Sequence, residues 1–208
     1  MRINEIFYSL QGEGYHTGRP AVFIRFSGCN LDCTFCDTDH SKYVEMTEEE
    51  IVMAATAVYG KADRVESCKV TTALVPKRGY VVLTGGEPAM QIADTLVDKL
   101  HQAGFGVAIE TNGTFRLPST IDWVTLSPKQ GTDHLAVTRC DELKIIFKES
   151  ADDYESMKMV EADHYYLQPC DMGDEVRNRQ ILKECIEYIL AHPTWRLSLQ
   201  THKLIGVR

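Results

Sequence analysis

The 208-residue sequence has no run of lysine or arginine that would form a basic stripe. Its 22 basic residues are outnumbered by 30 acidic ones, and the formal net charge is −8. A nucleic-acid surface needs concentrated positive charge to displace the counterions of the phosphates. The composition therefore predicts no nucleic-acid partner and favours a small-molecule substrate.

The sequence also lacks any apolar stretch near the roughly 20 residues that cross a bilayer. Residues 1–5 do not show the charged-then-apolar pattern of a signal peptide. No repeat, low-complexity tract or flexible linker divides the chain. We therefore expect a cytoplasmic protein with no membrane partner, folded as a single domain over residues 1–208.

The sequence contains seven cysteines, an odd number, and three of them fall within eight residues. This arrangement suits a metal or cluster site in a reducing compartment better than a framework of disulfides. The others are scattered, and we interpret them as buried or incidental thiols. They are Cys68, Cys140, Cys170 and Cys185.

Short apolar runs rich in β-branched and aromatic residues predict six or seven buried strands. They cover residues 21–26, 80–84, 106–110, 123–126, 143–147, 165–168 and 196–200. Helices are predicted from a capping box at Thr47, over 88–104, over 175–191 and, with a weaker pattern, over 152–160. This alternation gives an α/β fold with a mainly parallel sheet. The helices are too few for eight units, so we expect a partial, open TIM-type barrel.

The clustered cysteines, Cys29, Cys33 and Cys36, have the spacing C-x3-C-x2-C and directly follow the first predicted strand. Three thiolates can hold one face of a four-iron cluster, whereas electron-carrying clusters use four cysteines. The missing fourth ligand would leave one iron open to another molecule. On these residues alone, a zinc site completed by His40 or by a distant cysteine stays open as the alternative.

Further polar segments come at the ends of other predicted strands. Thr84 begins the run T-G-G-E-P, in which glycines let the backbone approach a ligand and Glu87 offers an acceptor for an ammonium group. Ser127 begins S-P-K and Gln168 begins Q-P-C-D. Because the carboxyl ends of parallel strands meet at one mouth, we expect these segments to surround a single site.

In its cysteine loop and its glycine turn, the chain resembles the radical S-adenosylmethionine (SAM) superfamily. That superfamily places C-x3-C-x2-C after the first strand of a partial barrel, with an aromatic residue, here Phe35, before the last cysteine. The resemblance implies a [4Fe–4S] cluster on Cys29, Cys33 and Cys36, with SAM on the fourth iron. Reduction of the cluster would cleave SAM to a radical that abstracts a hydrogen atom.

Other segments resemble one family of this superfamily, the 7-carboxy-7-deazaguanine synthases. They are I-F-Y-S-L-Q-G-E-G from Ile6, G-R-P from Gly18, C-D-T-D from Cys36 and Q-T-H-K from Gln200. The resemblance implies a carbon–nitrogen lyase that converts 6-carboxy-5,6,7,8-tetrahydropterin to 7-carboxy-7-deazaguanine and ammonia. It implies reductive SAM cleavage, hydrogen abstraction and a Mg²⁺-assisted ring contraction, on the route to queuosine.

The same resemblance implies which residues form the site, with no catalytic side chain beyond the cluster and the SAM-derived radical. The residues expected at the substrate are Leu10, Gln11, Gly12, Glu13, Arg25, Thr84, His202 and the terminal carboxylate of Arg208. Those expected at SAM are Phe35, Cys36, Asp37, Gly85, Gly86, Glu87, Ser127, Pro128, Lys129, Gln168, Pro169, Cys170 and Asp171. Thr38 is expected to bind Mg²⁺, a cation that prefers oxygen ligands. Residues 1–20 and 201–208 are expected to close over the site.

Two other functions stay open at this point. One is a glycyl-radical-enzyme activating protein of the same superfamily, which would need a mouth open enough for a peptide. The other is a non-enzymatic scaffold that binds zinc or an iron–sulfur cluster. The resemblance further implies a homodimer and a flavodoxin-type reductant, and neither follows from the residue pattern.

Overall fold

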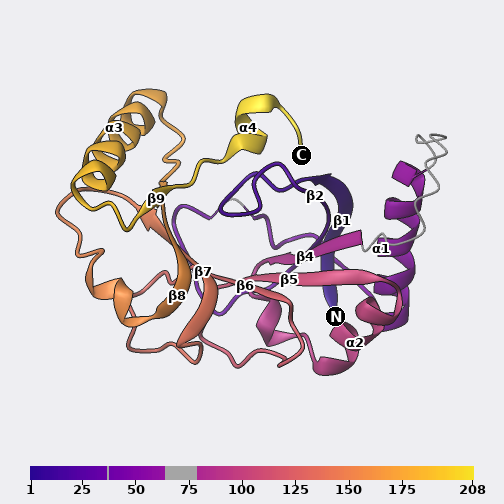
Figure 1. Cartoon of the computed structure of the whole chain (residues 1–208). Helices are drawn as coiled ribbons and strands as arrows, with labels where there is room; N and C mark the ends of the chain where they lie inside the picture. The colour runs from indigo at the N-terminus through magenta and orange to yellow at the C-terminus, as the bar shows by residue number, and fades with distance from the viewer. Residues whose placement is uncertain (37, 64–78) are drawn as a thin grey trace, which may run out of the picture.

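The computed structural model describes residues 1–36, 38–63 and 79–208. Within these residues, nine strands form one sheet in the order β3-β1-β2-β4-β5-β6-β7-β8-β9 (Figure 1). They are β1 (Arg2–Leu10), β2 (Pro20–Phe26), β3 (Val44–Glu45), β4 (Gly79–Gly85), β5 (Phe105–Thr111), β6 (Trp123–Leu126), β7 (Arg139–Phe147), β8 (Glu161–Pro169) and β9 (Arg196–Leu197). The sheet has two ends and does not close, so the expected open, partial barrel is confirmed.

From β2 to β9, every neighbouring pair of strands is parallel. The central strands are covered on both faces, and Val81, Val82 and Leu83 of β4 are all fully buried. This explains why their sequences read as continuous apolar runs without alternation. The carboxyl ends of these strands consequently lie along one edge of the sheet, where the cysteine loop follows β2.

Two strands lie beyond the parallel part, and the sequence analysis does not predict either. β1 pairs antiparallel with β2, and the two-residue β3 pairs antiparallel with β1. β1 has no apolar run because Glu5, Phe7 and Ser9 share one face at alternate positions. The expected number of six or seven strands is therefore too low.

Helix α1 (Glu48–Asp63) begins at the predicted capping box, in which the amide of Glu50 donates to Thr47 Oγ1 at 3.2 Å. Helix α3 (Glu175–Ala191) has its predicted bounds. The single helix predicted over 88–104 is wrong: a 3₁₀ turn (Pro88–Met90) and α2 (Asp94–Gln102) are separated by extended backbone at Ala93. The segment 152–160 contains only a 3₁₀ turn (Ser156–Met159), whose start is tied to Asp153 by hydrogen bonds.

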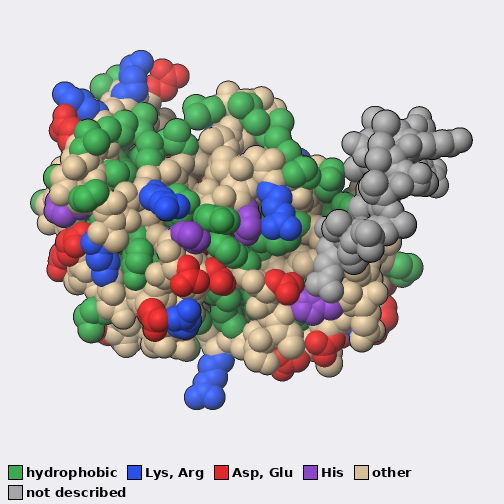
Figure 2. All heavy atoms as spheres, in the orientation of Figure 1, with side chains coloured by type: hydrophobic (Ala, Val, Ile, Leu, Met, Phe, Trp, Pro, Cys, Tyr) green, Lys and Arg blue, Asp and Glu red, His purple; other side chains and the backbone are tan. Residues whose placement is uncertain are grey.

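The core has two main parts beneath these helices. α1 and α2 cover one half of the sheet, and α3 lies at the other (Figure 1). The short helix α4 (Thr201–Ile205) carries the C-terminus back towards β1 and β2. On the face in Figure 2, the Lys and Arg side chains of the described residues are interspersed with acidic and apolar ones. No helix in the described part of the chain is long and apolar enough to span a bilayer.

Candidate active site

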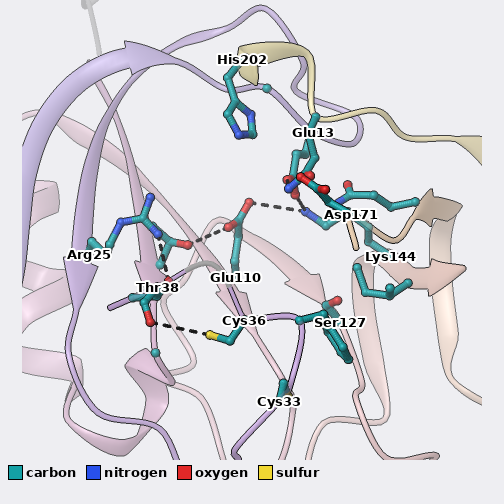
Figure 3. Close-up of a pocket in the computed structure, with 18 of the residues that line it drawn as sticks. Glu13, Arg25, Cys33, Cys36, Thr38, Glu110, Ser127, Lys144, Asp171 and His202 are labelled. Carbon is teal, nitrogen blue, oxygen red and sulfur yellow. Dashed lines mark hydrogen bonds and ion pairs between the residues drawn. The ribbon is translucent and has the colours of Figure 1, made fainter. Parts of the chain in front are cut away.

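A cavity of about 600 Å³ lies at the carboxyl ends of the parallel strands, between the cysteine loop and the C-terminal segment. Figure 3 shows Arg25 and Thr38 on one side, Glu110 at the centre and Lys144 on the other side, with His202 above. Strands β1, β2, β4, β5, β7 and β8 all contribute residues to its wall. The cavity is therefore built by segments from both ends of the chain as well as the middle.

The structure brings nearly all of the predicted site residues to this one cavity. The residues that line it are Leu10, Gln11, Gly12, Glu13, Arg25, Cys29, Cys33, Phe35, Cys36, Thr38, Thr84, Gly85, Gly86, Ser127, Lys129, Gln168, Pro169, Cys170, Asp171, His202 and Arg208. Glu87 and Pro128 are described by the structure but do not line the cavity. Asp37 and Cys68 lie outside the described residues.

The cysteine loop presents its three thiols to the cavity. Cys29 Sγ accepts the Leu31 amide at 3.4 Å, and Cys36 Sγ lies 3.9 Å from His40 Nε2. Burial is the largest cause that raises the pKa of the Cys29 thiol. Among the described side chains, no three metal-ligating groups are close enough to hold one ion. Three cysteines lining one chamber match the thiolate set of a four-iron cluster that leaves one iron open.

Asn112, at the end of β5, braces this loop. Its Nδ2 donates to Asn30 Oδ1 at 3.0 Å and lies 3.9 Å from Cys29 Sγ. Asn30 in turn donates to Thr114 Oγ1 at 3.0 Å. The loop between the first two cysteines is thus tied by hydrogen bonds to the segment that follows β5.

The glycine turn packs directly against the start of the cysteine loop. A Cβ on Gly86 would come within 2.0 Å of the Gly28 carbonyl oxygen, so no larger residue fits there without backbone movement. The Glu87 carboxylate is fully buried and accepts from Thr111 Oγ1 and the Asn112 amide, each at 2.7 Å. Glu87 therefore ties β4 to β5, and the cavity wall carries the backbone of Gly85 and Gly86 instead.

A buried cation, Lys144 of β7, organises the opposite wall. Its Nζ forms an ion pair with Glu13 and lies 3.7 Å from Glu110 Oε1. Glu110 also accepts from Gln11 Nε2 at 3.1 Å and from Thr84 Oγ1 at 2.7 Å. One carboxylate thus connects three segments that are far apart in sequence.

The charges in this network determine one another's ionisation. Burial raises the pKa of Glu13, but attraction to Lys144 and hydrogen bonds outweigh it and bring the pKa to about 2. Burial likewise lowers the pKa of Lys144, and the carboxylates of Glu13, Glu110 and Glu142 more than reverse that effect. The site therefore holds a permanent buried ammonium among carboxylates.

The C-terminal segment is attached to this wall at several points. Gln200 Nε2 donates to Glu13 Oε1 at 2.9 Å, and the Thr201 amide donates to the Gly12 carbonyl at 2.9 Å. Lys203 pairs with Asp171 at 2.7 Å, which contributes to holding the pKa of Asp171 near 2. These contacts place His202 above the cavity (Figure 3).

Thr38 and Arg25 form the remaining wall. Arg25 NH1 donates to Thr38 Oγ1 at 3.3 Å, and Arg25 Nε pairs with Glu5 at 2.9 Å. The Arg25 side chain is 26% exposed and lines the cavity. An anionic ligand group would meet a fixed positive charge here.

Glu110 and Lys144 are not among the site residues predicted from the sequence, although each leaves a signal in it. Glu110 ends a predicted strand, and the strand-end argument used for Ser127 and Gln168 applies equally to it. Lys144 is a lone charge within the apolar run L-K-I-I-F, a position where a lysine needs buried partners.

An open parallel sheet with three thiols and a glycine turn at its carboxyl edge defines a radical SAM protein. The model of the radical SAM superfamily accordingly matches residues 23–160. A 7-carboxy-7-deazaguanine synthase of Bacteroides thetaiotaomicron is 50% identical over 207 residues, covering 100% of this chain and 98% of the relative. One of Nitratidesulfovibrio vulgaris is 44% identical, covering 99% and 98%. The chain belongs to the 7-carboxy-7-deazaguanine synthase family.

A solved structure supports the same assignment. QueE from Escherichia coli superposes with a TM-score of 0.68 at 29% identity, covering 95% of this chain and 92% of that one. The chain is therefore an enzyme of the radical SAM superfamily, and its family implies a [4Fe–4S] cluster, SAM and Mg²⁺ as cofactors.

The buried network makes Lys144 a strong determinant of stability. Lys144→Met should lower the free energy of unfolding by about 3–5 kcal/mol, because it leaves buried carboxylates without their counter-charge. Urea denaturation measures the loss. The matched control is Lys183→Met, which removes a lysine from an exposed pair with Glu187 and should change stability by less than about 0.5 kcal/mol. Equal effects of the two variants would contradict the role given to Lys144.

Glu142, buried beneath the Tyr15 amide, should make stability depend on pH. Burial raises its pKa from 4.5 to about 7, against the attraction of Lys144. The folded state then binds the proton more tightly than the unfolded state, so stability falls as pH rises through this range. Glutamine does not titrate, so Glu142→Gln lacks this pH dependence. The free energy of unfolding of the variant, relative to that of the wild type, should rise by ~3 kcal/mol between about pH 4 and pH 8. Urea denaturation at each pH tests it, and a difference that stays constant would overturn it.

Proposed function

We propose that this enzyme converts 6-carboxy-5,6,7,8-tetrahydropterin to 7-carboxy-7-deazaguanine with release of ammonia, in queuosine biosynthesis. The names of its relatives support this reaction. The observation that carries it is the shared chamber: the three cysteines and the polar network around Glu110 line the same cavity. A cofactor on the cysteine loop and a substrate on that network would thus face each other inside one enclosure.

The cofactor half of the site fits a cluster with SAM. Cys29, Cys33 and Cys36 would ligate the cluster, which supplies the electron that cleaves SAM so that a hydrogen atom is removed from the substrate. SAM would be held by the residues named for it that line the cavity. Among them, Lys129 donates to Ser127 Oγ at 2.7 Å, and the partly buried Gly85 and Gly86 line the chamber.

The substrate half matches the edge of a pterin, which presents amide-like donors and acceptors. Gln11, Glu110 and Thr84 are fixed by hydrogen bonds to one another, so they offer polar groups whose directions are set before the substrate arrives. Glu13 is held by Lys144 and Gln200. Such preorganisation reduces the cost of orienting a rigid, flat ligand.

The carboxylate of the substrate would lie at Arg25 and Thr38. Arg25 supplies a permanent positive charge, and Thr38 offers a neutral hydroxyl oxygen of the kind that Mg²⁺ accepts. His202 and the terminal carboxylate of Arg208 would close the substrate side from above, as part of residues 201–208. Residues 1–20 would close the same side within a single domain, because Gly12 and Ser9 contact Thr201 and Arg208.

The cellular context follows the family. We propose a cytoplasmic homodimer that receives electrons from a flavodoxin-type protein. The six described cysteines are all free thiols, which suits a reducing compartment. Analytical ultracentrifugation tests the dimer, and spectroscopic reduction of the cluster by reduced flavodoxin tests the partner.

The reaction itself is tested directly. Anaerobically reconstituted protein, incubated with carboxytetrahydropterin, SAM, Mg²⁺ and dithionite, should release 7-carboxy-7-deazaguanine and 5′-deoxyadenosine, detected by mass spectrometry. Cleavage of SAM without a deazapurine product would reject the substrate while leaving the superfamily assignment intact. A colourless protein with stoichiometric zinc would reject both.

The metal ligand is tested at Thr38. Thr38→Ala should raise the Mg²⁺ concentration for half-maximal activity about tenfold, because the cation loses a fixed oxygen ligand. The absorbance of the cluster should not change. Thr56→Ala is the matched control, since Thr56 is exposed on α1 and its hydroxyl donates to the Val52 carbonyl of its own helix at 2.8 Å. An unchanged Mg²⁺ dependence in Thr38→Ala would exclude Thr38 as the ligand.

A further inference from the structure

One face of β1 forms a strip that none of the assigned roles uses. Glu5, Phe7 and Ser9 occupy alternate positions of the strand and so project to the same side. Phe7 lines the cavity and stacks on Phe23, with ring centroids 5.1 Å apart. Glu5 lies directly opposite Arg25 in the β1–β2 register.

The last residue of the chain contacts all three positions of this strip. The Arg208 guanidinium pairs with Glu5 and lies 5.1 Å from the centre of the Phe7 ring. The main-chain oxygen of Arg208 accepts a hydrogen bond from the Ser9 hydroxyl at 2.5 Å. The Arg208 side chain is 70% exposed, and a long exposed side chain otherwise keeps its rotamer freedom. Three simultaneous contacts therefore indicate a specific binding position on β1, which we call the Arg208 seat.

The two oxygens of Glu5 serve two different arginines. Oε1 accepts from Arg25 Nε, and Oε2 accepts from Arg208. Both guanidiniums also lie near the same Phe7 ring, at 6.0 and 5.1 Å. Two positive groups this close repel one another, and Glu5 is the carboxylate that compensates them.

We infer that Glu5 is a positioning residue that fastens the C-terminal arginine over the cavity while it holds Arg25 against Thr38. Seating of Arg208 places the terminal carboxylate at the mouth, and the same carboxylate of Glu5 orients the guanidinium meant for the substrate. Closure of the tail and formation of the anion-binding wall are thereby coupled through one side chain. The consequence for catalysis rests on the proposed function, whereas the seat for Arg208 does not.

The seat is tested by carboxypeptidase B, which removes C-terminal arginine only when the chain end is free. On the reconstituted holoenzyme under anaerobic conditions, Glu5→Gln should release Arg208 roughly two- to fivefold faster than the wild type, the effect of losing one partly exposed ion pair. Ser9→Ala should also accelerate release. Intact-protein mass spectrometry follows the loss of one arginine.

The matched control is Glu161→Gln, which makes the same change in the exposed Arg139–Glu161 pair at the amino ends of β7 and β8. Glu161→Gln should release Arg208 at the same rate as the wild type. Equal rates for Glu5→Gln and the wild type would overturn the inference, as would the same acceleration in Glu161→Gln. The melting temperature of each variant shows whether faster release of Arg208 reflects a freed chain end or general unfolding.

Steady-state kinetics test the coupling to the substrate. Glu5→Gln should raise KM for the carboxypterin severalfold with a smaller change in kcat, and Glu5→Gln combined with Arg208→Met should be less than additive. Additive effects would show that Glu5 does not act through Arg208. If neither the wild type nor any variant turns over the pterin, the proposed reaction is rejected. The rates of Arg208 release still test whether Glu5 holds Arg208.

Discussion

The Lys144 ammonium is the interaction on which the site depends. Lys144 lies on β7 and its side chain is 6% exposed, so it needs counter-charge from the protein itself. That counter-charge comes from Glu13 in the loop after β1 and Glu110 at the end of β5. The N-terminal loop is thereby held on the parallel sheet, and the C-terminal segment follows because Gln200 binds the same Glu13.

The cysteine loop is held by close backbone packing and not by buried charge. Gly86 lies against the Gly28 carbonyl, and the amides of Gly86 and Glu87 donate to Phe26 and Gly28 at 2.9 Å. The buried Glu87 then secures the turn to β5. In this chain the acidic residue of the glycine turn thus stabilises the scaffold, and the ligand-facing surface is left to backbone groups. The position of the cysteine loop is thus set by backbone contacts with the glycine turn.

The parallel strands could be predicted from the sequence because their burial on both faces leaves an unbroken apolar run. β1 could not, since one face carries Glu5 and Ser9 toward charged partners supplied by β2 and by residue 208. The break near Ala93 was hidden for a similar reason: the pattern from Pro88 onward is helical, but the Gln91 side chain bonds the Ser27 carbonyl of another loop. In each case a contact distant in sequence decides the local structure. The site residues carried by motifs were gathered as expected, whereas Lys144 and its partners follow from tertiary electrostatics.

The charge network and the backbone packing stabilise different halves of the cavity, and the two halves should differ in their sensitivity to salt. The half around the cysteines rests on backbone fit and hydrogen bonds within the sheet, which salt hardly affects. The half around Arg25 and the termini includes partly exposed ion pairs, whose attraction salt screens over about 10 Å at 0.1 M. The contacts that hold Arg208 on β1 belong to this second half, while the Gly86–Gly28 packing lies in a separate part of the fold. Assembly of the cofactor half and capture of the substrate are consequently separable properties of one chamber.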